Sequence, residues 1–243
     1  ARVLSSPVTR IRFGGRVRQR STANLAAMTR TAVLFDLGGV VLGSPLHAIR
    51  EYEAELGLER NAINLVAANT APSGAWSRLE RGELQMEEFY PAFESDCREA
   101  GIEMDAREMM TRMSHATDPR PMMLEAIRRL RAAGYRVGAL TNNWAHTEDA
   151  DDAGRNDGTR ALKDLFDVFI ESSVEKLRKP DPKIYELACE RLERPPEEIV
   201  FLDDIGPNLK PPKAMGMATI KVDEPEAALR ELEGHLGLSL IEE

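Results

Sequence analysis

Thr31-Ala-Val-Leu-Phe-Asp-Leu-Gly-Gly-Val-Val-Leu42 is the stretch of sequence that decides the fold. Residues 32–35 are a short apolar run of the kind that forms a buried strand. Asp36 follows this run directly, and the two glycines after it leave the backbone free to turn sharply. Because acids and glycines are also common in ordinary turns, the stretch indicates a site only if later segments provide partners for Asp36.

Beyond residue 119, helix-like and strand-like segments alternate. The spacing of apolar residues predicts strands at 135–140, 166–170, 199–202 and 218–222, and helices at 121–133, 181–192, 209–215 and 225–236. This alternation predicts an α/β fold with a Rossmann-like parallel sheet and right-handed crossovers. Residues 46–118 instead predict several short amphipathic helices whose methionines fill a core. Residues 148–160 are polar and predict a surface loop or a frayed helix.

Polar side chains occur where three of the predicted strands end. Asp36, the pair Thr141-Asn142 and the pair Asp203-Asp204 each stand at such a position. The carboxyl ends of parallel strands meet at one edge of a sheet, and ligands bind beyond that edge. We therefore expect these three groups to lie close together.

A basic residue, Lys179, lies in a turn that leads into the helix predicted from Asp181. Prolines bracket this turn, which reads Arg178-Lys-Pro-Asp-Pro-Lys183. Considered alone, Lys179 is typical of a solvated lysine before a helix. Placed beside the three polar groups, its ammonium group would neutralise a phosphoryl dianion.

These residue types suit phosphoryl transfer. The carboxylates of Asp36, Asp203 and Asp204 are the hard oxygen ligands that Mg²⁺ prefers together with water and substrate phosphate. Thr141 and Asn142 can donate hydrogen bonds to phosphoryl oxygens, in a reaction that depends on positioning and charge stabilisation. Asp36 would act as a carboxylate nucleophile and form an aspartyl-phosphate. The alternative, that Asp203 and Asp204 cap the next helix, accounts for only one of the two acids.

Four motifs follow one another along the chain. They read Phe-Asp-Leu-Gly-Gly-Val (35–40), Leu-Thr-Asn-Asn (140–143), Arg-Lys-Pro-Asp-Pro-Lys-Ile-Tyr (178–185) and Val-Phe-Leu-Asp-Asp-Ile-Gly-Pro-Asn-Leu-Lys (200–210). Together they resemble the motifs of the haloacid dehalogenase-like (HAD) hydrolase superfamily. The resemblance covers about residues 31–241. It looks closest to the phosphatase domain at the start of soluble epoxide hydrolases and to the similar domain of some acyl-CoA dehydrogenase fusion proteins.

The resemblance implies a domain plan and a set of roles. Residues 31–45 and 119–243 would form the HAD-like α/β core, and residues 46–118 an inserted helical cap over the site. The family implies an Mg²⁺-dependent phosphatase acting on a small phosphomonoester. The implied roles are a catalytic nucleophile (Asp36), phosphoryl-group ligands (Thr141, Asn142 and the catalytic Lys179), Mg²⁺ ligands (Asp36, the Gly38 carbonyl and Asp204) and residues that support the metal site (Asp203 and Asn208).

One position departs from the family pattern. Phosphatases of this family usually carry a second Asp two residues after the nucleophile, where it acts as general acid and base, and this chain has Gly38 there. Such acid–base help is worth about 10²- to 10⁴-fold in rate. Gly38 therefore predicts an impaired acid–base step, and it leaves open a non-catalytic domain that binds phosphate or another partner. A haloacid dehalogenase is a minor alternative, because its site is free of metal and usually lacks the acid pair.

Charge is distributed unevenly along the 243 residues. The net charge is −9, yet residues 1–30 contain seven Arg and no acid, so the remainder carries −16. An acidic body argues against nucleic-acid binding. The basic leader (residues 1–30) is typical of a mitochondrial transit peptide, or is an upstream artefact before Met28. No run approaches the roughly 18 apolar residues of a membrane span. The two cysteines lack metal-ligand spacing, so we expect an intracellular protein, cytoplasmic or mitochondrial.

Overall fold

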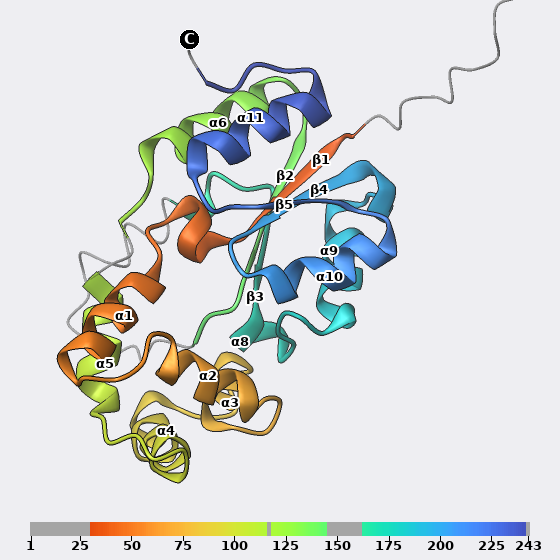
Figure 1. The fold of residues 1–243 in the computed structure, drawn as a ribbon. Helices are drawn as coiled ribbons and strands as arrows, with labels where there is room; N and C mark the ends of the chain where they lie inside the picture. The colour runs from red at the N-terminus through yellow and green to blue at the C-terminus, as the bar shows by residue number, and fades with distance from the viewer. Residues whose placement is uncertain (1–29, 116–117, 145–161, 242–243) are drawn as a thin grey trace, which may run out of the picture.

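The computed structural model describes residues 30–115, 118–144 and 162–241. Residues 1–29 of the predicted leader and the predicted loop at 148–160 lie outside the described residues. Five parallel strands form one sheet in the order β3-β2-β1-β4-β5 (Figure 1). Their bounds are β1 (Ala32–Phe35), β2 (Arg136–Thr141), β3 (Val168–Glu171), β4 (Ile199–Asp203) and β5 (Ala218–Lys221). The predicted α/β class with a parallel sheet is confirmed.

The register of the central strands sets the position of the first acid. In β1, Phe35 lies level with Ala139 of β2 and Leu202 of β4. The next residue, Asp36, donates its backbone N–H to the Leu202 carbonyl at 2.9 Å. Asp36 therefore leaves the sheet at the same level as Asp203, as expected for adjacent parallel strands.

Strands β2, β3 and β4 each end one residue later than predicted, and in β2 and β4 the added residue belongs to the predicted site. Thr141 is the last residue of β2, paired with Glu171, and Asp203 is the last residue of β4, paired with Lys221. Both polar residues continue the backbone pairing, because hydrogen bonds between strands do not depend on the side chain. The first member of each polar pair is consequently held by the sheet, and the second follows it.

Helices cover both faces of the sheet and make three layers (Figure 1). One face packs against α6 (Pro121–Ala132) and α11 (Pro225–Leu236), and the other against α9 (Pro182–Leu192) and α10 (Gly206–Met215). Each of these four helices has a proline in its first turn, where a missing N–H costs no hydrogen bond. The proline at 207 also explains why α10 begins three residues before the predicted helix at 209–215.

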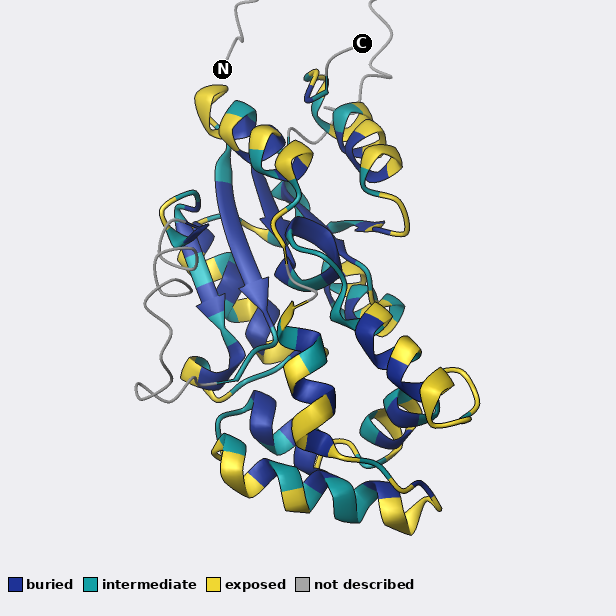
Figure 2. Ribbon diagram, turned by 90° about the vertical axis from the view of Figure 1, so that its left-hand side faces the viewer, coloured by how far each residue is buried: buried dark blue, intermediate teal, exposed yellow. Residues whose placement is uncertain are grey.

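In the sequence, a helical insert (residues 45–115) lies between β1 and the other four strands. Its helices are α1 (Pro45–Glu55), α2 (Ala62–Asn69), α3 (Ala75–Glu80), α4 (Met86–Glu99) and α5 (Ala106–His115). The insert has its own hydrophobic core, in which Phe89 and Phe93 stack with ring centroids 5.2 Å apart. Met109, Met110 and Met113 are buried in it, as the sequence predicts. The arrowheads of the strands point toward the insert (Figure 2).

The chain enters and leaves the insert at adjacent points. Gly43 donates its backbone N–H to the Asp118 carbonyl, and Arg120 donates its N–H to the Val41 carbonyl, each at 2.9 Å. Leu42 and Pro119 form an antiparallel bridge between these two bonds. The two crossings are therefore tied together beside the end of β1.

Three short helices complete the described part of the chain: η1 (Leu37–Val41), α8 (Ser172–Glu175) and η2 (Pro196–Glu198). None of the helices in the described ranges is both long enough and apolar enough to span a bilayer.

The two glycines of η1 serve different purposes. Gly39 has φ of +77°, and a Cβ atom on it would lie 2.1 Å from Asp204 Oδ2. Gly38 has φ of −63° and ψ of 127°, which any residue adopts. A Cβ there would meet only Pro45, at an ordinary 3.6 Å. The backbone thus requires a glycine at position 39 but not at position 38.

We predict that Gly39→Ala lowers the free energy of unfolding by about 1–3 kcal/mol, because the new methyl group strains the backbone and displaces the Asp204 carboxylate. Gly38→Ala is the matched control, with an expected change within about 1 kcal/mol. Urea unfolding of the two variants beside the wild type measures both values. An equal loss at the two positions would contradict this account of the turn.

Candidate active site

Three acids meet at the carboxyl end of the sheet. Asp36 follows β1, Asp203 ends β4, and Asp204 begins the next loop. One carboxylate oxygen from each of the three lies within 4.8 Å of the others. The prediction that these acids converge from separate segments is therefore confirmed.

Lys179 is buried among these acids. Its Nζ atom lies 2.9 Å from Asp36 Oδ1 and 2.7 Å from Asp203 Oδ2, and the residue is 1% exposed. A buried ammonium group is stable only where such partners replace water. Lys179 therefore belongs to the acid cluster and is not a solvated lysine.

Asp203 contacts both the turn before α10 and the acid cluster, although no side chain in the described ranges caps α10 itself. Its Oδ1 accepts the backbone N–H of Ile205 at 2.8 Å, which shapes the turn into α10. The side-chain amide of Asn208 donates to both carboxylate oxygens, at 3.1 and 3.2 Å. Asp203 thus orders the turn before the helix while its other oxygen binds Lys179. Asn208 lies where a supporting residue was expected.

The Asn142 side chain holds the backbone of Lys179. Its Oδ1 accepts the Lys179 N–H at 2.9 Å, and its Nδ2 donates to the Lys179 carbonyl at 3.1 Å. The same Nδ2 lies 3.4 Å from Glu80 Oε2. Both N–H groups of this amide are therefore directed at protein atoms. The predicted contact of Asn142 with a phosphoryl group stays a prediction, and the donor for that contact would be the backbone N–H of Asn142.

Thr141 and Gly38 lie at the same edge of the sheet. Thr141 is 6% exposed, and within the described ranges its Oγ1 has one hydrogen-bond contact, a long one of 3.4 Å to the Asn142 carbonyl. Gly38 lies in the turn directly after Asp36, and its neighbour Gly39 is close to Asp204. The structure thus brings every predicted site residue to one edge, although their roles stay predictions.

The acids carry more negative charge than Lys179 can balance. Burial raises the pKa of Asp36 well above its usual value; Asp203 and Asp204 raise it further, and Lys179 opposes the rise. Burial, followed by Asp203, raises the pKa of Asp204 to about 6. Burial would lower the pKa of Lys179, but Asp203 and Asp36 outweigh it and raise the pKa. An additional cation would relieve the repulsion among the acids.

The donor set fits a divalent cation. Asp36 and Asp204 offer carboxylate oxygens that lie close together and have an excess of negative charge around them. Carboxylate and carbonyl oxygens are the ligands that Mg²⁺ takes in proteins, and the residues present therefore suit this ion.

Three charged residues near the site had no predicted role. Glu80 comes from the helical insert and binds Arg178, and Arg120 is close enough to Asp204 to lower the pKa of its carboxyl group. Arg178 stands beside Lys179 in the third motif, which could have drawn attention to it. Glu80 and Arg120 carry no comparable signal in the sequence.

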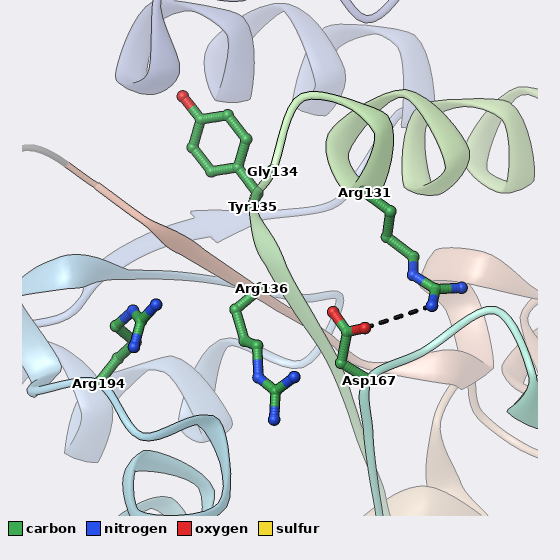
Figure 3. A pocket seen from close by; sticks show the side chains of 6 residues that line it. All are labelled: Arg131, Gly134, Tyr135, Arg136, Asp167 and Arg194. Atoms are coloured by element: carbon green, nitrogen blue, oxygen red, sulfur yellow. Dashed lines mark ion pairs between the residues drawn. The ribbon is translucent and has the colours of Figure 1, made fainter.

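A separate hollow of about 400 Å³ lies at the opposite end of the sheet (Figure 3). Arg131, Gly134, Tyr135, Arg136, Asp167 and Arg194 line it. Arg131 pairs with Asp167 at 3.3 Å, and Arg194 approaches Glu198 at 3.8 Å, so most of its charge is balanced. The hollow lies where β2 begins, whereas the acid cluster lies where the strands end. We therefore place the candidate active site at the acid cluster and not in this hollow.

Comparisons with known proteins agree with this geometry. A family model described as haloacid dehalogenase-like hydrolase matches residues 31–216. Acyl-CoA dehydrogenase family member 10 of Mus musculus is 35% identical over 212 residues, which are 86% of this chain and 19% of that protein. Bifunctional epoxide hydrolase 2 of Sus scrofa is 34% identical over 229 residues, which are 88% of this chain and 40% of that protein. The chain thus spans less than half the length of these two relatives.

A third relative matches over nearly its whole length. The sesquiterpene phosphatase astK of Aspergillus oryzae is 28% identical over 210 residues, which are 86% of this chain and 98% of that protein. Among solved structures, a HAD family enzyme of Bacteroides thetaiotaomicron, in complex with magnesium and inorganic phosphate, has a TM-score of 0.54 and 20% identity. The match covers 79% of this chain and 93% of that one, and it shows the shared fold. The motifs, the parallel sheet and the family match together show that this chain belongs to the haloacid dehalogenase-like hydrolases.

Proposed function

We propose that this hydrolase is an Mg²⁺-dependent phosphatase that acts on a small phosphomonoester through an aspartyl-phosphate. The observation that carries the proposal is the buried contact of Asp36 with Lys179 beside Asp204. The sesquiterpene phosphatase named above and the fold shared with an enzyme that binds magnesium and phosphate support it. The helical insert would act as the cap that covers the substrate.

The contacts of Asp36 indicate which oxygen attacks. Oδ1 accepts the Leu37 N–H at 2.7 Å and contacts Lys179 at 2.9 Å. Among the described residues no hydrogen bond or ion pair holds Oδ2. One oxygen is therefore fixed by the protein, and the other is available to the substrate.

The reaction then has two displacements. An Oδ2 electron pair forms a bond to phosphorus while the bond from phosphorus to the ester oxygen breaks, and the departing alkoxide takes a proton from water to become the alcohol. Water next attacks the phosphorus, which releases inorganic phosphate and restores the Asp36 carboxylate. Lys179, Thr141 and the backbone N–H of Asn142 would orient the phosphoryl group.

Asp36, Asp204 and the Gly38 carbonyl would hold Mg²⁺, with Asp203 and Asn208 supporting them. When bound, Mg²⁺ would shield the negative charges of the nucleophile and of the phosphoryl group from each other.

Gly38 limits the proton transfers. Glycine has no side chain that could protonate the departing alcohol or deprotonate the attacking water. Substrates whose leaving groups are stable as anions need this help least, and they should react fastest. Gly38 also favours the second candidate function, a domain that binds phosphate without turnover.

We predict that Asp36→Asn abolishes hydrolysis of an activated aryl phosphate, because an amide is not a nucleophile, and that EDTA abolishes the wild-type activity. Release of the aryl alcohol measures both. Binding of beryllofluoride, a phosphoryl mimic, is measured in parallel on the two proteins.

Equal hydrolysis by Asp36→Asn and wild type would overturn the proposed function. If the wild type binds beryllofluoride with Mg²⁺ but neither protein turns over, the non-catalytic binding function replaces it. Release of chloride from 2-chloropropionate without Mg²⁺ would instead indicate a dehalogenase.

We also predict that Gly38→Asp raises kcat on a substrate with a poor leaving group by about 10²-fold or more, because the new carboxyl group restores a general acid and base. The backbone at position 38 accepts a side chain, since the first added carbon meets only Pro45. Gly38→Asn is the matched control with the same shape and no titratable proton. An equal effect of the two substitutions would count against the missing acid as the cause of slow turnover.

A further inference from the structure

Glu80 is a buried carboxylate of the helical insert, and its side chain faces the α/β core. It is the last residue of α3 and is 6% exposed. Its Oε2 accepts Arg178 Nε at 2.5 Å and lies 3.4 Å from Asn142 Nδ2. A charged group at the end of a surface helix ordinarily stays in water, and its burial here therefore needs an explanation.

The contacts of Glu80 reach the loops that carry the site. Asn142 follows β2, and Arg178 directly precedes Lys179. The backbone carbonyl of Glu80 also accepts a hydrogen bond from Ser172 Oγ at 2.6 Å. Ser172 directly follows β3. One residue of the insert thus contacts three segments of the core within a single cluster.

These contacts lead to the nucleophile in a continuous chain. Glu80 contacts the Asn142 amide, which holds the N–H and the carbonyl of Lys179. The Lys179 ammonium group in turn contacts Asp36 and Asp203. The N–H that Asn142 gives to Glu80 also orients the amide, since its oxygen must then face the Lys179 N–H.

Charge supports this arrangement. Burial raises the pKa of Glu80, while Arg178 opposes the rise through its charge and its hydrogen bond. The charge of Lys179 also acts against the rise. The carboxylate is therefore stabilised by core residues beside the site, and movement of α3 away from the core would leave Arg178 and Asn142 without this partner.

We propose that Glu80 is a positioning residue that couples the packing of the helical insert on the core to the placement of Lys179. The effect on catalysis rests on the proposed function, whereas the effect on Lys179 does not. Glu80 touches neither Asp36 nor the phosphoryl position, and it acts through Asn142.

The direct test is hydrogen exchange of the Lys179 amide, whose proton is donated to Asn142 Oδ1. In full-length protein labelled with ¹⁵N-lysine, we expect this amide to exchange at least about tenfold faster in Glu80→Gln than in wild type, the size expected for loss of a hydrogen bond to a charged group. Glu87→Gln is the matched control. It also removes a Glu–Arg pair within the insert, with Arg107 at 2.6 Å, but on the exposed surface. Unchanged exchange in Glu80→Gln would overturn the inference.

Activity separates this inference from the proposed function. With an activated aryl phosphate we expect kcat of Glu80→Gln to fall about tenfold or more, with Glu87→Gln unchanged and Glu80→Asp, which keeps the charge, intermediate. If Lys179 exchanges faster in Glu80→Gln than in wild type, but the wild type lacks phosphatase activity, the proposed function is disproved and the positioning role stays intact. If Glu80→Gln does not fold, the same two measurements on Glu80→Asp decide, and wild-type values for both would overturn the inference.

Discussion

The ammonium group of Lys179, buried between Asp36 and Asp203, is the interaction on which the rest of the structure depends. A charge at this depth is stable only while its partners stay in place, and the loss of any one leaves an uncompensated charge. The contact therefore joins β1, β4 and the loop before α9, three segments that are far apart in the sequence. The same constraint explains why Asn142 and Asn208 use their amides on protein atoms, since each fixes one member of the charged group.

Much of the fold could be predicted from the sequence because the sheet is built from local patterns. The apolar run before Asp36 and the alternation after residue 119 identify the strands, and the rule that parallel strands end together brings the acids to one edge. The strand ends at Thr141 and Asp203 were less predictable, because backbone pairing ignores side-chain polarity. The role of Glu80 was not predictable, since its burial depends on how the insert packs on the core, and a short helix ending in an acid is typical of a solvated surface.

The two glycines that follow Asp36 in η1 differ in whether the backbone requires a glycine. At position 39 the positive φ and the nearby Asp204 carboxylate exclude a side chain. At position 38 the backbone is ordinary and the space is open. The missing side chain beside Asp36 is therefore not a consequence of the fold, and backbone geometry does not explain it.

The tie between the two crossings of the chain has a consequence for how the helical insert can vary. Residues 41–43 and 118–120 lie side by side, and the helical insert between them has a hydrophobic core of its own. A segment that starts and ends at neighbouring points closes a loop without passing through the sheet, and its length and sequence can change while the strand order stays the same. Recombination or gradual divergence between these two points would exchange the helical insert and leave the sheet and the acid cluster intact. Glu80 is one place where such an exchange must match the core, because a new insert without a corresponding carboxylate would leave Arg178 without this partner.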